Sequence, residues 1–318
     1  MLMNRILVLG GTGFVGRAVC ERLAERSASG VIVVPTRRAQ HADRVRALPT
    51  VQVVAADVHD DQALARLVAG CDAVVNLVAI LHGSAAAFDH VHVALPRRLA
   101  AACKAAGVQR LVHVSALGVG PQAPSNYLRS KTAGEAALAQ AGLALTVLRP
   151  SVIFGAEDQF LNVFARLQAV APVMPLAGGS ARFQPVWVED VATAIVNTLD
   201  QPASIGKVYE ATGPGTYTLS ELVRLAGKWS GHERMQIALP MALGRLQALV
   251  MECLPGQPLM SRDNLASMQV PNVASGTLPG LSALGITPTA MEAVAPDYLG
   301  ATHGRARLDR GRAGARRE

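Results

Sequence analysis

The chain has 318 residues, of which 50% are hydrophobic and 17% charged, enough for one large domain or for a nucleotide-binding domain with a smaller lobe. No uninterrupted apolar stretch reaches the ~20 residues of a membrane span, and residues 1–9 lack the features of a signal peptide, so we expect a cytoplasmic protein. The net charge of +7 does not indicate a nucleic-acid partner, because more than half of it lies in residues 305–318, with six arginines and two acidic residues.

The N-terminus runs from an apolar strand into a glycine-spaced turn, G-x-x-G-x-x-G, and then into an amphipathic segment. The first glycine permits a sharp turn, the second lets backbone approach a pyrophosphate, and the third lets the helix pack on the strand. Phosphates are favoured at that helix N-terminus by unpaired N–H groups and by the helix dipole. The residues expected to line a dinucleotide here are Gly10, Gly13, Phe14, Val15 and Gly16.

Strand-like and helix-like segments alternate through the first 150 residues. The expected strands after the first are 31–35, 51–55, 73–78, 110–115 and 145–148, and the expected helices are 14–27, 40–47, 60–69, 86–106 and 130–141. Near-continuous apolar strands are typical of a parallel sheet covered on both faces. This predicts a doubly wound α/β (Rossmann) domain that binds its ligand at the carboxyl ends of the strands.

The end of the second strand predicts the cofactor. Where an acidic side chain would bind the ribose of NAD, the chain has Thr36, Arg37 and Arg38. Two guanidinium groups can bind a 2′-phosphate, and no carboxylate repels it, so NADP(H) is favoured over NAD(H). The alternative is that these arginines only solvate the start of a helix.

Polar residues also follow the third and fourth strands. Asp57, with Val58 beside it, is placed to accept a hydrogen bond from the adenine amino group, or else to cap the next helix. Asn76, Leu77 and Val78 end the fourth strand at the mouth of the crevice, where backbone can pass beside the cofactor ribose.

A Y-x-x-x-K pair, Tyr127 and Lys131, lies on one face of a predicted helix, and Ser115 ends the fifth strand. A lysine ammonium near a phenol stabilises phenolate and so lowers its pKa. Tyr127 could then exchange a proton with a substrate oxygen that Ser115 orients, while Lys131 also holds the nicotinamide ribose. The alternative is that Tyr127 and Lys131 only seat the cofactor.

Beyond residue 150 the sequence pattern predicts loops, short helices and a Pro- and Gly-rich region. We expect residues 1–154 and about 183–200 to form the dinucleotide-binding domain, and 155–182 and 201–300 a small lobe. Thr218 and Glu221 form a capping box that opens a helix closed near Gly231. Residues 301–318 are expected to be a disordered Arg-rich tail, either without function or in contact with anionic lipid or a partner.

Neither the cysteines nor the histidines predict a metal site. Cys20, Cys71, Cys103 and Cys253 form no C-x-x-C pair and are expected to be core thiols in a reducing compartment. His90 and His92 are two residues apart, which would point them in different directions on a helix.

The glycine turn, Asp57, Ser115, Tyr127/Lys131 and residues 149–155 together resemble the extended and atypical short-chain dehydrogenase/reductase superfamily over residues 4 to about 300. That resemblance implies that Pro150, Ser151 and Val152 lie beside the nicotinamide. It also reveals a departure: His92 stands where many extended enzymes have an asparagine.

A narrower likeness lies in residues 35–38, 76–81, 113–118, 149–158 and 182–186. These segments resemble the NADPH-binding accessory subunits of respiratory complex I and their bacterial relatives, a group that includes proteins tied to ubiquinone biosynthesis. The resemblance implies an NADPH-binding accessory or redox protein linked to the respiratory chain or quinone metabolism. Its partner would be a respiratory or quinone-pathway complex, met by peripheral contact at the inner membrane.

Two further functions stay open. An active NADPH-dependent oxidoreductase or epimerase/dehydratase could use Ser115, Tyr127 and Lys131 on a carbonyl or alcohol substrate. A redox-sensing regulator is less favoured, because the Tyr–Lys pair is intact.

Overall fold

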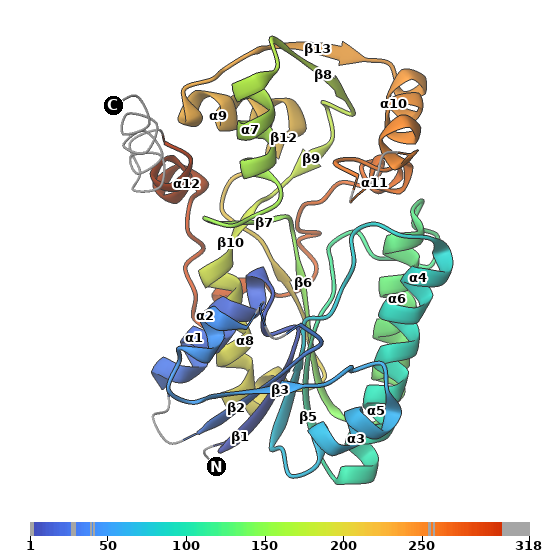
Figure 1. The fold of residues 1–318 in the computed structure, drawn as a ribbon, viewed down its shortest axis with the longest axis vertical. Coiled ribbons are helices and arrows are strands. Elements are labelled where there is room, and N and C mark those ends of the chain that lie inside the picture. Colours follow the sequence, from blue (N-terminus) through green and yellow to red (C-terminus); the bar gives the residue numbers. More distant parts are fainter. Residues whose placement is uncertain are drawn as a thin grey trace.

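A computed structural model describes residues 3–26, 30–38, 40, 42–253, 256 and 258–300. Its centre is a seven-stranded parallel sheet of order β11-β6-β5-β4-β1-β2-β3 (Figure 1). The strands are β1 (Arg5–Leu9), β2 (Val31–Thr36), β3 (Val51–Ala55), β4 (Ala73–Asn76), β5 (Arg110–Val114), β6 (Ala144–Pro150) and β11 (Val208–Ala211). The predicted doubly wound α/β fold is therefore confirmed.

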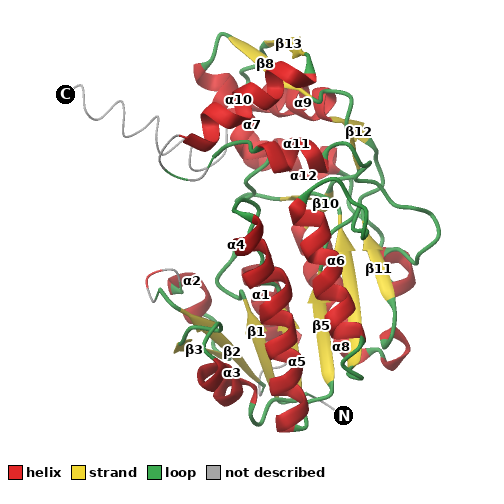
Figure 2. Ribbon diagram, turned by 90° about the vertical axis from the view of Figure 1, so that its right-hand side faces the viewer, coloured by secondary structure: helices red, strands yellow, loops and turns green. Residues whose placement is uncertain are grey.

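Helices cover both faces of this sheet because strand side chains alternate between two apolar cores. Val8 packs on one face with α1 (Phe14–Arg26) and α8 (Val188–Asp200), beside the short α2 (Asp43–Arg46). Leu7 and Leu9 pack on the other with α3 (Asp61–Val68), α5 (Leu95–Ala106) and α6 (Asn126–Ala139). Figure 2 shows α5 and α6 side by side across this second face.

The predicted helix 86–106 is present, but it is not uniform. It comprises α4 (Ala85–Asp89), a π-helical turn (His90–Ala94) and α5. A π-helical turn contains one more residue than an α-helical turn, so side chains beyond it are rotated around the axis relative to an unbroken helix.

The second lobe lies at the carboxyl edge of the sheet (Figure 1). Its core is formed mainly by α7 (Leu161–Val170), α9 (Leu219–Ser230) and α12 (Met291–Leu299). The predicted capping box of Thr218 and Glu221 and the left-handed Gly231 bound α9, as expected. Around it are α10 (Met241–Cys253), α11 (Arg262–Ser267) and three strand pairs: β7 (Ile153–Phe154) with β10 (Val186–Trp187), β8 (Val173–Ala177) with β13 (Met235–Leu239), and β9 (Arg182–Phe183) with β12 (Tyr217–Thr218).

One expected boundary needs correction. Residues 201–300 do not all belong to the small lobe, because β11 pairs in parallel with β6 and forms an edge of the central sheet. A short 3-10 helix, Leu281–Leu284, also packs against α8 in the first core. The chain therefore returns to the sheet twice after it first enters the lobe.

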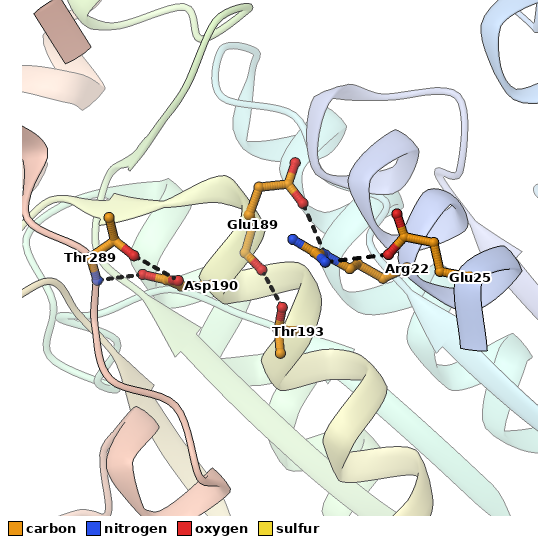
Figure 3. Close-up of polar contacts among 6 residues, drawn as sticks. All are labelled: Arg22, Glu25, Glu189, Asp190, Thr193 and Thr289. Carbon is orange, nitrogen blue, oxygen red and sulfur yellow. Dashed lines mark hydrogen bonds and ion pairs between the residues drawn. The ribbon is translucent and has the colours of Figure 1, made fainter. Parts of the chain in front are cut away.

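Residues in the first turn of α8 bond both to α1 and to the segment that precedes α12. Figure 3 shows Arg22 of α1 between Glu25 and Glu189, at 3.3 and 3.2 Å, and Thr289 donating to the Asp190 carboxylate through its backbone N–H (2.7 Å) and its hydroxyl (3.1 Å). The segment leading to α12 is thus tied to the same helix turn as α1.

The expected Arg-rich tail, 301–318, lies outside the described residues. Within the part that is described, no helix combines the length and apolarity required for a membrane crossing.

Candidate functional site

The glycine-spaced turn between β1 and α1 is built by close backbone approaches. Gly10 has φ +82°, and a Cβ there would lie 3.2 Å from the carbonyl carbon of Leu77. A Cβ on Gly16 would lie 2.2 Å from the Gly10 oxygen, and one on Gly13 3.2 Å from it. Each glycine therefore allows a close backbone approach that a Cβ atom would crowd or block. Phe14 and Val15 open α1, whose first-turn N–H groups have no partner within the helix.

The end of β2 presents two cations beside this turn. The Thr36 hydroxyl donates to the Arg38 carbonyl (3.1 Å) and accepts from the Arg38 N–H (3.2 Å), which fixes the backbone turn. Arg37 and Arg38 are exposed, and neither forms an ion pair with another described residue. Their guanidinium groups are available to an anion.

Next to the turn is a cavity of about 370 Å³ that the sequence did not predict. It is lined by Thr12, Arg17, Gln40, Asp43, Arg44 and Glu157. Both Arg17 and Arg44 contact the Glu157 carboxylate, which comes from the loop after β7. These residues meet only in the fold, so no local sequence pattern could have joined them.

Asp57 follows β3 and is exposed. Its carboxylate accepts from the His59 N–H at 3.0 Å, whereas the N-cap of α3 is Asp60, which accepts from Ala63 N–H at 2.6 Å. The alternative in which Asp57 caps this helix is therefore wrong. Contact of Asp57 and Val58 with adenine stays a prediction.

The ends of β4 and β5 bring buried polar atoms together. Asn76 accepts from the Val78 N–H (3.2 Å), and its amide nitrogen lies 3.2 Å from Nδ1 of His113. Nε2 of His113 and Oγ of Ser115 are both buried and have no hydrogen-bond partner in the described structure. Buried polar atoms without a partner are rare and mark places where a ligand or water completes the bonding. Ser115 directly follows β5 and lies two residues after His113, so the two side chains point to the same side of the sheet.

Lys131 and Tyr127 come to this edge on α6. The Lys131 ammonium is buried and donates to the Val114 carbonyl at 2.8 Å. Burial lowers the pKa of Lys131 to about 8, although the carboxylate of Glu135 acts in the opposite direction. Arg149 of β6 holds that carboxylate with two hydrogen bonds, of 3.0 and 2.6 Å.

The phenol of Tyr127 does not behave as the sequence predicted. Its half-buried ring packs edge-on against His92 and Phe88, with centroid distances of 5.5 and 6.0 Å. Burial raises the pKa of Tyr127 to about 12, instead of Lys131 lowering it. The ammonium is engaged by a backbone carbonyl, so in this state the phenol carries its proton.

The start of α6 is set by residues far away in the chain. Ser125 is the N-cap, and the Asp263 carboxylate of α11 accepts from the N–H groups of Asn126 (2.8 Å) and Tyr127 (3.0 Å). The helix therefore begins at Asn126, four residues before the predicted start. The small lobe thus caps the helix that carries Tyr127.

Residues Pro150, Ser151 and Val152 are likewise held by the lobe. The Ser151 hydroxyl donates to the Asn272 side-chain oxygen (2.6 Å), which also accepts from the Val152 N–H (3.1 Å). Sequence reasoning identified neither Asn272 nor Asp263, because each acts through hydrogen bonds to residues more than 100 positions away in the chain. Contact of residues 150–152 with a nicotinamide stays a prediction.

A parallel sheet with a glycine-lined turn, orphaned buried polar atoms and a Tyr–Lys pair at one edge defines an NAD(P)-binding Rossmann protein. Residues 6–211 match the NAD dependent epimerase/dehydratase family, to which the chain belongs. It is 31% identical to mouse NADH dehydrogenase [ubiquinone] 1 alpha subcomplex subunit 9, mitochondrial, over 90% of this chain and 77% of that protein. It is also 31% identical to the ceramide reductase of Caulobacter vibrioides, over 74% of this chain and 73% of that one.

Solved structures share the fold. An NADPH-dependent quinone oxidoreductase from Escherichia coli superimposes with a TM-score of 0.71 at 25% identity, covering 91% of this chain and 98% of that one. The same enzyme in complex with NADPH gives a TM-score of 0.72 at 22% identity, with the same coverage.

The buried ammonium gives a prediction for stability. Below pH 8 Lys131 is charged in both the folded and the unfolded chain. Between pH 8 and its ordinary value of 10.5 the folded chain releases the proton while the unfolded chain keeps it. Because the unfolded state then binds more protons, this group makes stability rise with pH, by up to ~1.4 kcal/mol per pH unit.

Replacing Lys131→Met should remove that rise. The measurement is urea unfolding of wild type and variant between pH 8 and 10, with Lys104→Met as the matched control because Lys104 is an exposed lysine on α5. Parallel stability curves for wild type and Lys131→Met across this window would contradict the assignment.

Proposed function

We propose that the protein binds NADPH in preference to NADH and acts as an accessory or redox protein of the respiratory chain or quinone metabolism. The observation that carries the cofactor preference is the turn after β2, where the Thr36 hydroxyl fixes the backbone around Arg37 and Arg38. Two exposed guanidinium groups at this position favour a 2′-phosphate over a ribose hydroxyl. The link to quinone chemistry is supported by the relatives, one a subunit of a ubiquinone-reducing complex by name and one a quinone oxidoreductase.

The cofactor preference can be tested by binding. Wild-type protein should bind NADPH at least about tenfold more tightly than NADH, since one charge-assisted hydrogen bond contributes ~1.5–3 kcal/mol. The double substitution Arg37→Ala with Arg38→Ala should weaken NADPH binding and leave NADH binding unchanged. Titration calorimetry measures both, with Arg97→Ala, an exposed arginine on α5, as control. Equal affinity of the wild type for the two nucleotides would refute the preference.

A second candidate function is catalysis by the same site, as an NADPH-dependent oxidoreductase or epimerase/dehydratase. It is favoured by the unpartnered Oγ of Ser115, a buried hydroxyl that a substrate oxygen can bond to. NADPH when bound supplies a hydride. The phenol would then give its proton to the reduced oxygen, Ser115 would orient that oxygen, and Lys131 would hold the ribose.

Catalysis is tested by NADPH oxidation across a panel of quinones and enones. Tyr127→Phe should lower the rate by ~10²–10⁴-fold, the usual contribution of a positioned acid, and leave the Kd for NADPH within a few fold. Tyr209→Phe, in the buried strand β11, is the control for loss of a tyrosine hydroxyl elsewhere. Any detected rate that Tyr127→Phe leaves unchanged would remove the acid–base role for that substrate.

The accessory role places the protein in the cytoplasm and peripherally at the inner membrane, in contact with a respiratory or quinone-pathway complex. Support comes from the small lobe, where α10 exposes Leu243, Leu246 and Val250 to 52, 57 and 56%. An apolar face of this kind on a helix otherwise anchored by Gly244 and Ala248 is typical of an interaction surface.

Affinity purification from solubilised membranes should therefore recover named respiratory or quinone-pathway proteins, identified by mass spectrometry. Leu243→Asp with Leu246→Asp should abolish that recovery and leave NADPH binding intact, whereas Arg245→Ala, at an exposed position of α10 outside this apolar face, is the matched control. A monomer found wholly in the soluble fraction, without these proteins, would count against the accessory role.

A further inference from the structure

The imidazole of His92 is a buried group that the functions above do not use. It lies in the π-helical turn, is 2% exposed, and both of its nitrogens have partners. Nε2 lies 3.1 Å from the backbone nitrogen of Ile80, and Nδ1 lies 2.9 Å from Oγ of Ser130, whose hydroxyl is 2.8 Å from the Tyr127 carbonyl oxygen.

These contacts determine which nitrogen carries the proton. The Ile80 N–H can only donate, so Nε2 must accept and be unprotonated. The Ser130 hydroxyl gives its hydrogen to the Tyr127 carbonyl, so its oxygen accepts from the N–H of Nδ1. His92 is therefore a neutral imidazole with opposite hydrogen-bonding roles at its two ends.

The loop that His92 holds begins at the dinucleotide turn. Leu77 and Val78 pack directly against Gly10, where a Cβ would meet them at 3.2–3.3 Å, and Asn76 accepts from the Val78 N–H. Two residues further on, Ile80 bonds to His92. The loop after β4 is thus fixed to the glycine turn at one end and to the imidazole at the other.

The other side of His92 is the helix that carries Tyr127. Besides the bond through Ser130, the imidazole packs edge-on against the Tyr127 ring and stacks on Phe88, at centroid distances of 5.5 and 5.6 Å. In a regular α-helix one residue more or less changes the direction of a side chain by about 100°. The π-helical turn therefore aims His92 between the loop and α6.

We propose that His92 is a positioning residue that ties the loop after β4 to the first turn of α6, and so sets where Tyr127 lies relative to the dinucleotide turn. An effect of His92 on turnover presupposes the catalytic candidate function. The two hydrogen bonds of His92 are present whether or not the protein is an enzyme. The contribution is one of geometry, because His92 reaches the reacting centre only through Ile80 and Tyr127.

Burial and a neighbouring positive charge keep the His92 imidazole neutral. Burial, and to a smaller extent the Lys131 ammonium on α6, lowers the pKa of His92 to about 3. His113 on β5, a further titratable neighbour besides Tyr127, also has its pKa lowered by burial. A protonated His92 would direct a second donor at the Ile80 N–H, so the neutral ring is the form that holds the loop.

Amide hydrogen exchange followed by NMR tests the bond to the loop. His92→Phe keeps an aromatic ring against Phe88 and Tyr127 but has no nitrogen, and it should speed exchange of the Ile80 amide by about 100-fold or more. Ser130→Ala removes only the bond to α6 and should change it less than tenfold. His92→Gln supplies an acceptor and a donor and should restore most of the protection. Unchanged exchange of Ile80 in His92→Phe would overturn the proposal.

Two further measurements test the proposal. The imidazole tautomer needs no variant, and kcat is measured where a substrate is found. The imidazole ¹⁵N spectrum of the wild type should show the Nδ1–H tautomer at pH 7, and a protonated Nε2 would overturn the proposal without any variant. With a turned-over substrate, His92→Phe should lower kcat about tenfold while the Kd for NADPH stays within twofold, and His92→Gln should recover it. A normal kcat with a released Ile80 amide would reduce His92 to a structural role.

Absence of turnover in the wild type contradicts the catalytic candidate function alone. The Ile80 exchange and the tautomer then decide the proposal by themselves.

Discussion

The site depends on how closely three backbone segments approach one another at the carboxyl edge of the sheet. Gly10 leaves room for Leu77 and Val78, and Gly16 leaves room for the carbonyl of Gly10. With any side chain at these positions, either the turn or the loop after β4 would have to move. Because that loop continues to Ile80 and His92, the spacing of the glycines also bears on where Tyr127 lies. A motif usually interpreted as a phosphate cradle thus has a second consequence for the opposite side of the crevice.

The small lobe contributes to the same edge by holding residues that the first domain supplies. Asp263 caps the helix of Tyr127, and Asn272 binds the hydroxyl of Ser151 and the N–H of Val152. Each contact satisfies a backbone or hydroxyl group that would otherwise need water at the crevice. The two lobes are therefore coupled through the site, and a partner that displaces the small lobe would disturb α6 and residues 150–152 together.

Sequence patterns predicted the first 150 residues well because the strands there are buried on both faces and the helices have a regular apolar period. They placed Tyr127, Lys131 and Ser115 at one edge; the Lys131 ammonium donates to the carbonyl of Val114, the residue before Ser115, while the roles of all three residues stay predictions. They failed where distant segments meet, as where β11 pairs with β6 at the edge of the sheet. They also missed Ser125, the N-cap that starts α6 at Asn126 together with the distant Asp263 carboxylate. The interpretation of His92 as a mere departure from a family pattern missed its role, because a π-helical turn has no simple sequence signal.

The accessory and the catalytic functions make different demands on the same buried atoms. Binding a dinucleotide for structural reasons requires the glycine turn, the arginines after β2 and one ammonium near the ribose, whereas an alanine could replace Ser115 without loss. A buried hydroxyl without a partner destabilises the fold by ~1–3 kcal/mol relative to one that is bonded, and burial of the Lys131 ammonium adds a further unfavourable term. A chain that only needed a stable nucleotide-filled domain would gain by losing the Ser115 hydroxyl. The unpartnered hydroxyl of Ser115 therefore favours a site that meets a polar atom beyond the cofactor itself.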